Sequence, residues 1–186
     1  MTPFEGFPKM ARWSREIIIT EKIDGTNAQV FIGEDGEFLT GSRTRWITPA
    51  EDNYGFSAWA HANKDELMKL GTGRHFGEWW GAGIQRKYNI GEKRFSLFNV
   101  SRWMPETLST CCHVVPILYR GPNAPGIMEE CIKELTITGS RAAPGFMDPE
   151  GVVMFHTASG VGFKKTIKKD DALKALAQNN EGVIAA

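Results

Sequence analysis

A run of β-branched residues ends on a lysine and a turn at residues 16–27, which read EIIITEKIDGTN. Isoleucine and threonine favour strands, and glycine permits a sharp change of direction after one. Asp24 can accept hydrogen bonds from the amides that follow it, so its side chain can hold the turn. The pattern predicts a buried strand that presents Lys22 at the mouth of a sheet.

The rest of the chain has more strand patterns than helix patterns, without regular alternation between them. Strands are expected at 16–21, 28–32, 37–40, 75–79, 95–100, 113–119, 151–156 and 161–165. Helices are expected at 63–70, with Asn63 and Glu66 as a capping box, and at 125–135 and 170–178. Runs of strands with interspersed helices predict an α+β fold with mainly antiparallel sheets and flanking helices.

Composition limits the class of protein. Hydrophobic residues make up 41% and charged residues 24%, as in an ordinary globular chain, and 186 residues suit a single domain spanning 1–186. The 22 basic and 22 acidic residues cancel, which excludes a histone-like coat for nucleic acid. Because no signal-like start and no apolar run of roughly 18 residues is present, we expect a cytoplasmic location and no membrane partner.

The three cysteines, at 111, 112 and 131, form neither a metal-binding spacing nor a disulfide framework. The histidines at 75, 113 and 156 do not complete a zinc spacing with them. We therefore expect reduced, buried thiols and no zinc.

Lys22 has two interpretations when its segment is considered alone. A lysine before an Asp-Gly turn is commonly a solvated loop residue, but one at the end of a buried strand also suits a nucleophile. At pH 7 a lysine with a pKa near 10.4 is neutral in only about one molecule in a few thousand. A nucleophilic Lys22 therefore requires nearby cations or partial burial, so a second lysine or a metal should lie close to it.

Five later segments decide between these interpretations. EKIDGTN at 21–27 resembles motif I (KxDG) of the covalent nucleotidyltransferases, the superfamily of polynucleotide ligases and messenger-RNA capping enzymes. The other motifs follow in the family's order: GSRTRWI at 41–47, HFGEWWG at 75–81, SLFNV at 96–100, EGVVMF at 150–155 and GFKKTIKK at 162–169. The resemblance covers most of the chain and implies a ligase-type adenylyltransferase domain, which is ATP-grasp-like.

The spelling of these motifs is similar to that of the RNA ligases, in particular the T4 RNA ligase 2-like group. Thr26 and Asn27 follow the Asp-Gly turn, where DNA ligases and capping enzymes usually have an arginine two residues after the glycine. The resemblance implies an ATP-dependent RNA ligase that uses ATP and Mg²⁺ (or Mn²⁺). It would form a lysyl-AMP intermediate, adenylylate an RNA 5′-phosphate and join it to a 3′-hydroxyl.

The resemblance assigns a nucleotide site around motif I. Lys22 would attack the α-phosphorus of ATP, and Glu21 and Asn27 beside it would contribute to nucleotide binding. Glu78 would accept hydrogen bonds from the ribose, and Phe98 would stack on adenine. The ordinary alternatives are a glutamate on a surface strand and a phenylalanine in the core.

Two more residues would hold phosphate and metal. Arg43 would reach the ribose or a substrate phosphate with its planar fork of donors, and Arg45 could widen that patch. Glu150 would help to hold the catalytic metal, because Mg²⁺ prefers carboxylate, phosphate and water oxygens. Asn99 stands where the family often has an acid, which could weaken a metal-linked contact.

The last motif departs from the family pattern of two lysines separated by one residue. Lys164 has Thr166 two places later, so the second lysine is missing from the aligned position. Either Lys168 supplies it from the same strand face, or Lys165 does so through a register shift. Lys164 and Lys165 are expected to grip the α-phosphate and to lower the pKa of Lys22.

Two stretches beside Glu78 have open interpretations. Strand alternation sends Trp79 and Trp80 to opposite faces, so one should pack in the core while the other rims the pocket. The run Gln85-Arg86-Lys87 is equally consistent with a contact to nucleic acid phosphates and with a surface loop.

Few residues follow the last motif, so we expect a bare catalytic domain without an appended OB-fold. Such a chain would act on RNA ends or a nicked duplex, and a helper protein for substrate binding is a further expectation, since phosphate contacts dominate affinity for nucleic acid. The rival interpretations are a small ATP-dependent DNA ligase, a guanylyltransferase, and a nucleotide- or RNA-binding module that has lost its sealing activity.

Overall fold

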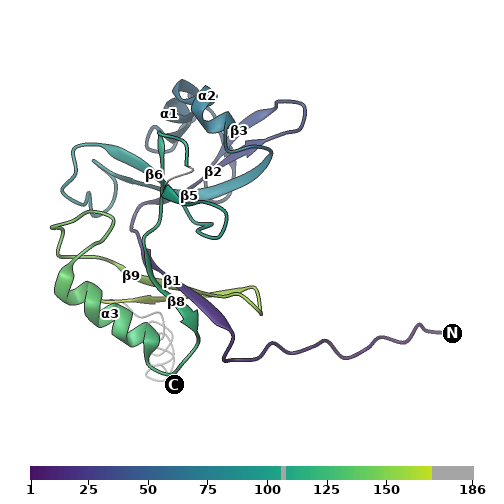
Figure 1. The fold of residues 1–186 in the computed structure, drawn as a ribbon. Helices are drawn as coiled ribbons and strands as arrows, with labels where there is room; N and C mark the ends of the chain where they lie inside the picture. The colour runs from purple at the N-terminus through teal and green to yellow at the C-terminus, as the bar shows by residue number, and fades with distance from the viewer. Residues whose placement is uncertain (106–107, 169–186) are drawn as a thin grey trace, which may run out of the picture.

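The computed structural model describes residues 1–105 and 108–168, which form two β-sheets flanked by three helices (Figure 1). The larger sheet has the order β4-β3-β2-β5-β6-β7 and the smaller one β10-β9-β1-β8. All strand pairs in the described residues are antiparallel except β6 with β7. The expected α+β fold with mainly antiparallel sheets is confirmed.

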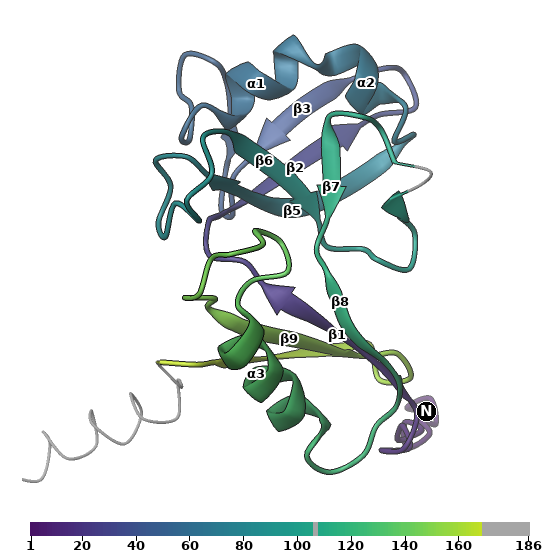
Figure 2. The same ribbon diagram turned by 60° about the vertical axis from the view of Figure 1, so that its left-hand side comes forward.

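One face of the larger sheet is covered by helices. The sheet comprises β2 (Thr26–Ile32), β3 (Phe38–Gly41), β4 (Trp46–Ile47), β5 (Gly73–Gly81), β6 (Lys93–Leu97) and β7 (Cys112–Val114). Alternate apolar side chains of β2, including Ala28, Val30 and Ile32, pack with residues of α1 (Phe56–Ala62) and α2 (Lys64–Met68). Figure 2 shows both helices on the side away from the smaller sheet.

The smaller sheet has a helix on its outer face. It comprises β1 (Glu16–Lys22), β8 (Ile117–Pro122), β9 (Gly151–His156) and β10 (Val161–Thr166). Ile17 and Ile19 of β1 form one buried cluster with Cys131 and Leu135 of α3 (Ile127–Thr138). The period of two therefore turns Ile18, Thr20 and Lys22 toward the larger sheet.

Two expectations about elements are wrong, and one helix is unanticipated. The strand expected at 113–119 is two strands, because Pro116 has no amide hydrogen to continue a ladder. Its two halves belong to different sheets, and the chain crosses between them there (Figure 2). The helix expected at 63–70 is present as the short α2, and an unanticipated α1 precedes it. Asn63 does not cap it, since its side-chain amide donates to the carbonyl of Trp59.

Among the described residues, no helix has both the length and the apolar character needed to cross a membrane. The longest, α3, has 12 residues. The helix expected at 170–178 lies outside the described residues.

Candidate active site

The turn after β1 carries the chain from the smaller sheet into the larger one. Gly25 is required there by close packing: a Cβ atom at this position would lie 2.4 Å from the carbonyl oxygen of Trp79 and 2.7 Å from the Cβ of Trp80. Its amide donates to Glu78 over 3.0 Å. The glycine therefore lets β2 begin directly against β5, next to the end of Lys22's strand.

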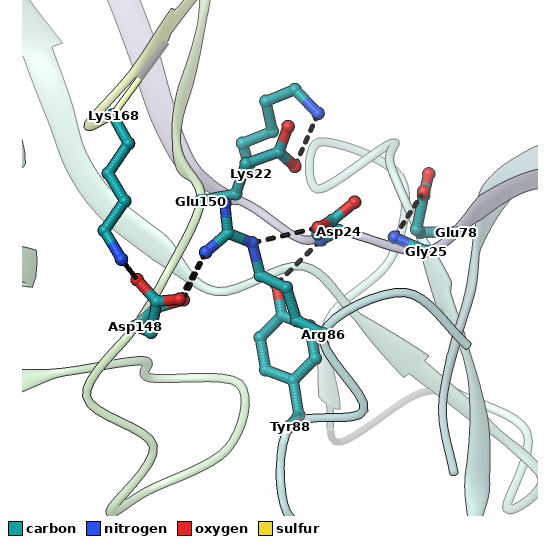
Figure 3. A network of polar contacts seen from close by, with 9 residues as sticks. All are labelled: Lys22, Asp24, Gly25, Glu78, Arg86, Tyr88, Asp148, Glu150 and Lys168. Carbon is teal, nitrogen blue, oxygen red and sulfur yellow. Dashed lines mark hydrogen bonds and ion pairs between the residues drawn. The ribbon is translucent and has the colours of Figure 1, made fainter. Parts of the chain in front are cut away.

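Lys22 lies beside Glu150 at the end of β1. Register pairs Lys22 with Gly151 of β9, so Glu150 comes immediately before its partner. The Lys22 Nζ is 2.7 Å from a Glu150 carboxylate oxygen, and the two side chains are 24% and 17% exposed (Figure 3). A carboxylate is thus a near neighbour of the Lys22 amine, and this ion pair holds the amine in position.

Glu78 is a buried carboxylate on the neighbouring sheet. It is 8% exposed and accepts hydrogen bonds from the Asn27 side-chain amide at 2.9 Å and from the Gly25 amide. Burial raises the pKa of Glu78 to about 7, although these two hydrogen bonds and the charge of Lys22 act in the opposite direction. Glu78 is thus a hydrogen-bond acceptor held in a fixed position, and it interacts electrostatically with Lys22.

A cavity of about 750 Å³ lies between the two sheets, in the range of small-molecule sites. Lys22, Asn27, Glu78 and Phe98 all line it, as do Val153 and Phe155 of β9. Phe98 follows β6 and is 41% exposed, so its ring is not a core residue. Five of the residues assigned to nucleotide binding, these four and Glu21, therefore line one cavity.

Three expected site residues differ from the expectation: Glu21 lines the cavity but turns its carboxylate away from it, and Arg43 and Lys165 do not line it. The Glu21 carboxylate points away from Lys22 and accepts hydrogen bonds from the Ser140 hydroxyl and the amides of Arg141 and Ala142, because alternation turns it to the α3 side of the sheet. Burial raises the pKa of Glu21 despite these bonds. Arg43 is an exposed residue in the turn between β3 and β4 and does not line the cavity.

Lys165 is the third. Register pairs it with Val152, whose side chain packs under α3, and its Nζ is 2.8 Å from Glu129 of that helix. Lys164 is paired with Val153 and therefore shares the cavity-facing side of the sheet. A register shift that would exchange the two lysines is absent from the described strand, and the contact of Lys165 with Glu129 does not support the role predicted for Lys165.

The remaining motif V candidates have other contacts. The Nζ of Lys168 is 2.5 Å from Asp148, outside the cavity lining. Thr166 is paired with Gly151, next to Lys22 in register, and its buried hydroxyl has no hydrogen-bond partner in the described part of the chain.

Both tryptophans after Glu78 are 1% exposed. Trp79 packs against Phe56 and the other aromatic residues under α1, and Trp80 packs between the sheets with Tyr88. The expectation that one would rim the pocket is wrong, because Trp80 is enclosed by a second apolar cluster and does not line the cavity.

Arg86 joins three segments around the site, a role that the sequence left open. Its guanidinium donates to Asp24 at 2.9 Å and to the side chain and carbonyl of Asp148 at 2.8 and 3.0 Å (Figure 3). Tyr88 accepts a hydrogen bond from the Asp24 amide at 2.7 Å. Arg86 therefore ties the motif I turn to the residues just before Glu150.

The cavity also contains two arginines that sequence reasoning missed, Arg74 and Arg102. Arg74 stands four residues before Glu78 on β5, so the strand period alone would have turned it to the same face. Arg102 lies in the loop after β6, where no regular period applies, and donates to the Leu70 carbonyl at 2.9 Å.

Comparison with known proteins agrees with this geometry. The RNA ligase family model matches residues 15–183. Among solved structures, an apo form of Naegleria gruberi RNA ligase matches with a TM-score of 0.59 and 19% identity over 82% of this chain and 50% of that one. A form with AMP and manganese has a TM-score of 0.58 and 17% identity over 83% and 50%.

A third form, with ATP and manganese, has a TM-score of 0.57 and 17% identity over 82% and 49%. This chain thus spans about half the length of these ligases, and at such identity they show the shared fold. No curated protein sequence matches it. The family match over most of its residues and the motif geometry lead to one assignment: this chain belongs to the RNA ligase family.

Proposed function

We propose that this chain is an ATP-dependent RNA ligase in which Lys22 becomes covalently joined to AMP. The observation that carries the proposal is the position of Lys22: it lines the same cavity as Glu78, Asn27 and Phe98 and is 2.7 Å from Glu150. A site that only binds nucleotide does not need an amine at this position. The related Naegleria ligase structures with ATP or AMP and manganese support ATP as the substrate.

The cavity residues divide the nucleotide between them. The exposed Phe98 ring offers a flat surface for the base, while the Glu78 carboxylate, held by Asn27, offers acceptors for ribose hydroxyls. Arg102, from the cavity, and Lys164, from its sheet face, provide positive charge for the phosphates. Fixed cations of this kind stabilise the charge that develops on phosphorus oxygens during displacement.

The residues present fit a divalent metal that is shared with the substrate. The described residues contain no group of three acidic, histidine or cysteine side chains that could hold a metal alone. Mg²⁺ is commonly held by one or two carboxylates together with substrate phosphates and water, and Glu150 supplies one such carboxylate. Bound Mg²⁺ or Mn²⁺ would neutralise phosphate charge and compete with the Lys22 ammonium for Glu150.

In the first step, the neutral Lys22 amine attacks the α-phosphorus, the new N–P bond forms, and pyrophosphate leaves with the electrons of the broken P–O bond. The nitrogen then loses one proton to solvent, which leaves a lysyl-AMP phosphoramidate. The AMP then passes to an RNA 5′-phosphate, and a 3′-hydroxyl displaces it to form the phosphodiester. RNA ends are therefore the proposed partner.

The intact mass of the protein after incubation with ATP and Mg²⁺ tests the proposal. The wild type should become heavier by one AMP, and Lys22→Ala should not. Lys165→Ala is the matched control, because it removes a lysine on the opposite face of the same sheet and should leave the adduct intact. An unmodified wild-type mass would contradict the proposal and favour a binding module, an adduct with GTP in place of ATP would indicate a guanylyltransferase, and transfer only to DNA ends would indicate a DNA ligase.

A further inference from the structure

We propose that the cavity-facing side of the larger sheet continues beyond the nucleotide site as a platform that stacks unpaired RNA bases. This inference rests on the proposed function and assigns a binding role to exposed rings, Trp46 and Phe76, for which the motif resemblance gave no role. We call this surface the aromatic face; it comprises Phe31, Trp46, Arg74, Phe76 and Phe98.

Strand register places three exposed rings in one row. The Phe98 amide donates to the Phe76 carbonyl at 3.0 Å, Phe76 is paired with Gln29, Gln29 with Gly41, and Gly41 with Trp46. Directly paired residues share a sheet face, and Phe76 shares that of Glu78 two residues later. Phe98, Phe76 and Trp46 are 41%, 51% and 42% exposed, so all three rings are accessible on that face.

Arg74 stiffens the outer end of the aromatic face. It is paired with Phe31, and its guanidinium carbon lies 5.1 Å from the ring centres of both Phe31 and Trp46. Its Nη1 also donates to the Gln29 side chain at 3.1 Å. Cation–π contacts thus hold an arginine beside the Trp46 ring, where it can meet a phosphate or stack on a base.

Gly41, in the middle of this row, has no side chain that would project from the sheet between the rings. A Cβ at Gly41 would lie 2.8 Å from the Gln29 side chain, so Gln29 lies over Gly41 between Trp46 and Phe76. Adjacent strands are about 4.8 Å apart, which puts roughly 14 Å between the β4 and β5 positions of this row. That distance suits a short stretch of single strand rather than one ring.

Charge and position favour single-stranded RNA as the occupant. From β4 to β5, the strand residues on this face beyond Glu78 include Arg74 and no acidic residue. The exposed Arg43 and Arg45 lie in the adjoining turn. Arg45 is 3.8 Å from Glu51. Arg74, Phe76 and Phe98 also line the proposed nucleotide cavity, so the surface is continuous with it. Aromatic side chains stack on unpaired bases of any sequence, whereas paired bases are already stacked within a duplex.

Trp46→Ala tests the platform, with Trp13→Ala as a matched control because Trp13 is 63% exposed but lies before β1. Fluorescence anisotropy would measure the binding of a labelled, 5′-phosphorylated eight-residue oligouridine and of a blunt RNA hairpin. We expect Trp46→Ala to raise the Kd for oligouridine by about 5- to 150-fold, the range of one lost base stack. Trp13→Ala should leave it unchanged, and Trp46→Phe should recover most of the affinity.

Mass measurement of the AMP adduct in the same samples separates the two proposals. A weaker Kd for Trp46→Ala supports the platform, whether or not the wild type forms an adduct, while a missing wild-type adduct contradicts only the ligase proposal. Wild-type affinity in Trp46→Ala, an equal loss in Trp13→Ala, or equal binding of hairpin and oligouridine by the wild type would overturn the platform.

Discussion

The residues on the two faces of the smaller sheet have different surroundings, although they alternate along the same strands. On the α3 side, Glu21 and Lys165 make contacts that join the sheet to its covering segments. On the other side, Lys22 and Lys164 face the larger sheet and the cavity. Adjacent charged residues thus contact the covering segments or face the cavity according to the side of the sheet on which they lie.

Replacing the two lysines of β10 by alanine, one at a time, should give the largest difference in adenylation rate between the two faces. Lys164→Ala should slow adenylation by about 100-fold or more, because a fixed cation near the transferred phosphate is lost. Lys165→Ala removes an exposed ion pair with Glu129 and should change the rate less than twofold. Single-turnover formation of the AMP adduct measures both, and equal effects would erase the distinction between the faces.

Removing Arg86 should have the next largest effect, because Arg86 positions the segments that carry Lys22 and Glu150. Arg86→Ala should lower the adenylation rate about 10- to 100-fold, as is typical when a supporting contact of a metal-site ligand is removed. The loss should fall on kcat more than on the KM for ATP, and Arg86→Lys should restore part of it. A rate loss fully accounted for by unfolded protein in circular dichroism would make Arg86 merely structural.

The free energy of unfolding should depend on pH through Glu78, on the cavity side. Because its folded pKa is raised from 4.5 to about 7, the folded state binds this proton more tightly, and stability from this group is lost as pH rises between those values. Between pH 5 and pH 8 the free energy of unfolding of the wild type should fall by about 2 kcal/mol relative to Glu78→Gln. Urea unfolding at both pH values measures this, and parallel pH profiles would refute it.

Glu21→Gln should have a smaller effect, of structural origin. The amide would place a donor against the donors of Ser140, Arg141 or Ala142, so one hydrogen bond of the buried carboxylate is lost. We expect a decrease in the free energy of unfolding of about 1 kcal/mol at pH 7. Urea unfolding checks the value, and a more stable variant would show that carboxylate burial costs more than its hydrogen bonds return.

Local sequence patterns predicted much of this architecture. The β-branched run before Lys22 and the alternating apolar residues of β2 predicted their strands, because burial on one sheet face imposes a period of two. The motif order predicted which side chains share the cavity: Lys22, Asn27, Glu78 and Phe98 all line it.

The misses have a common physical cause, since they depend on tertiary packing. Glu21 points toward α3 because that side of β1 packs against the helix. Trp79 and Trp80 are both buried because distant segments form an apolar cluster around each of them. Arg86 reaches Asp24 and Asp148 across 62 positions each, a contact for which no local pattern exists. Periodicity identifies alternate faces but does not tell which face is covered.

Peptide mapping of the AMP adduct tests the central claim most directly. After incubation with ATP and Mg²⁺, proteolysis and mass spectrometry should locate AMP on the Lys22 side chain, in a peptide spanning the end of β1. AMP found on Lys164, Lys165 or another residue, with Lys22 unmodified, would contradict the assignment of Lys22 as the nucleophile.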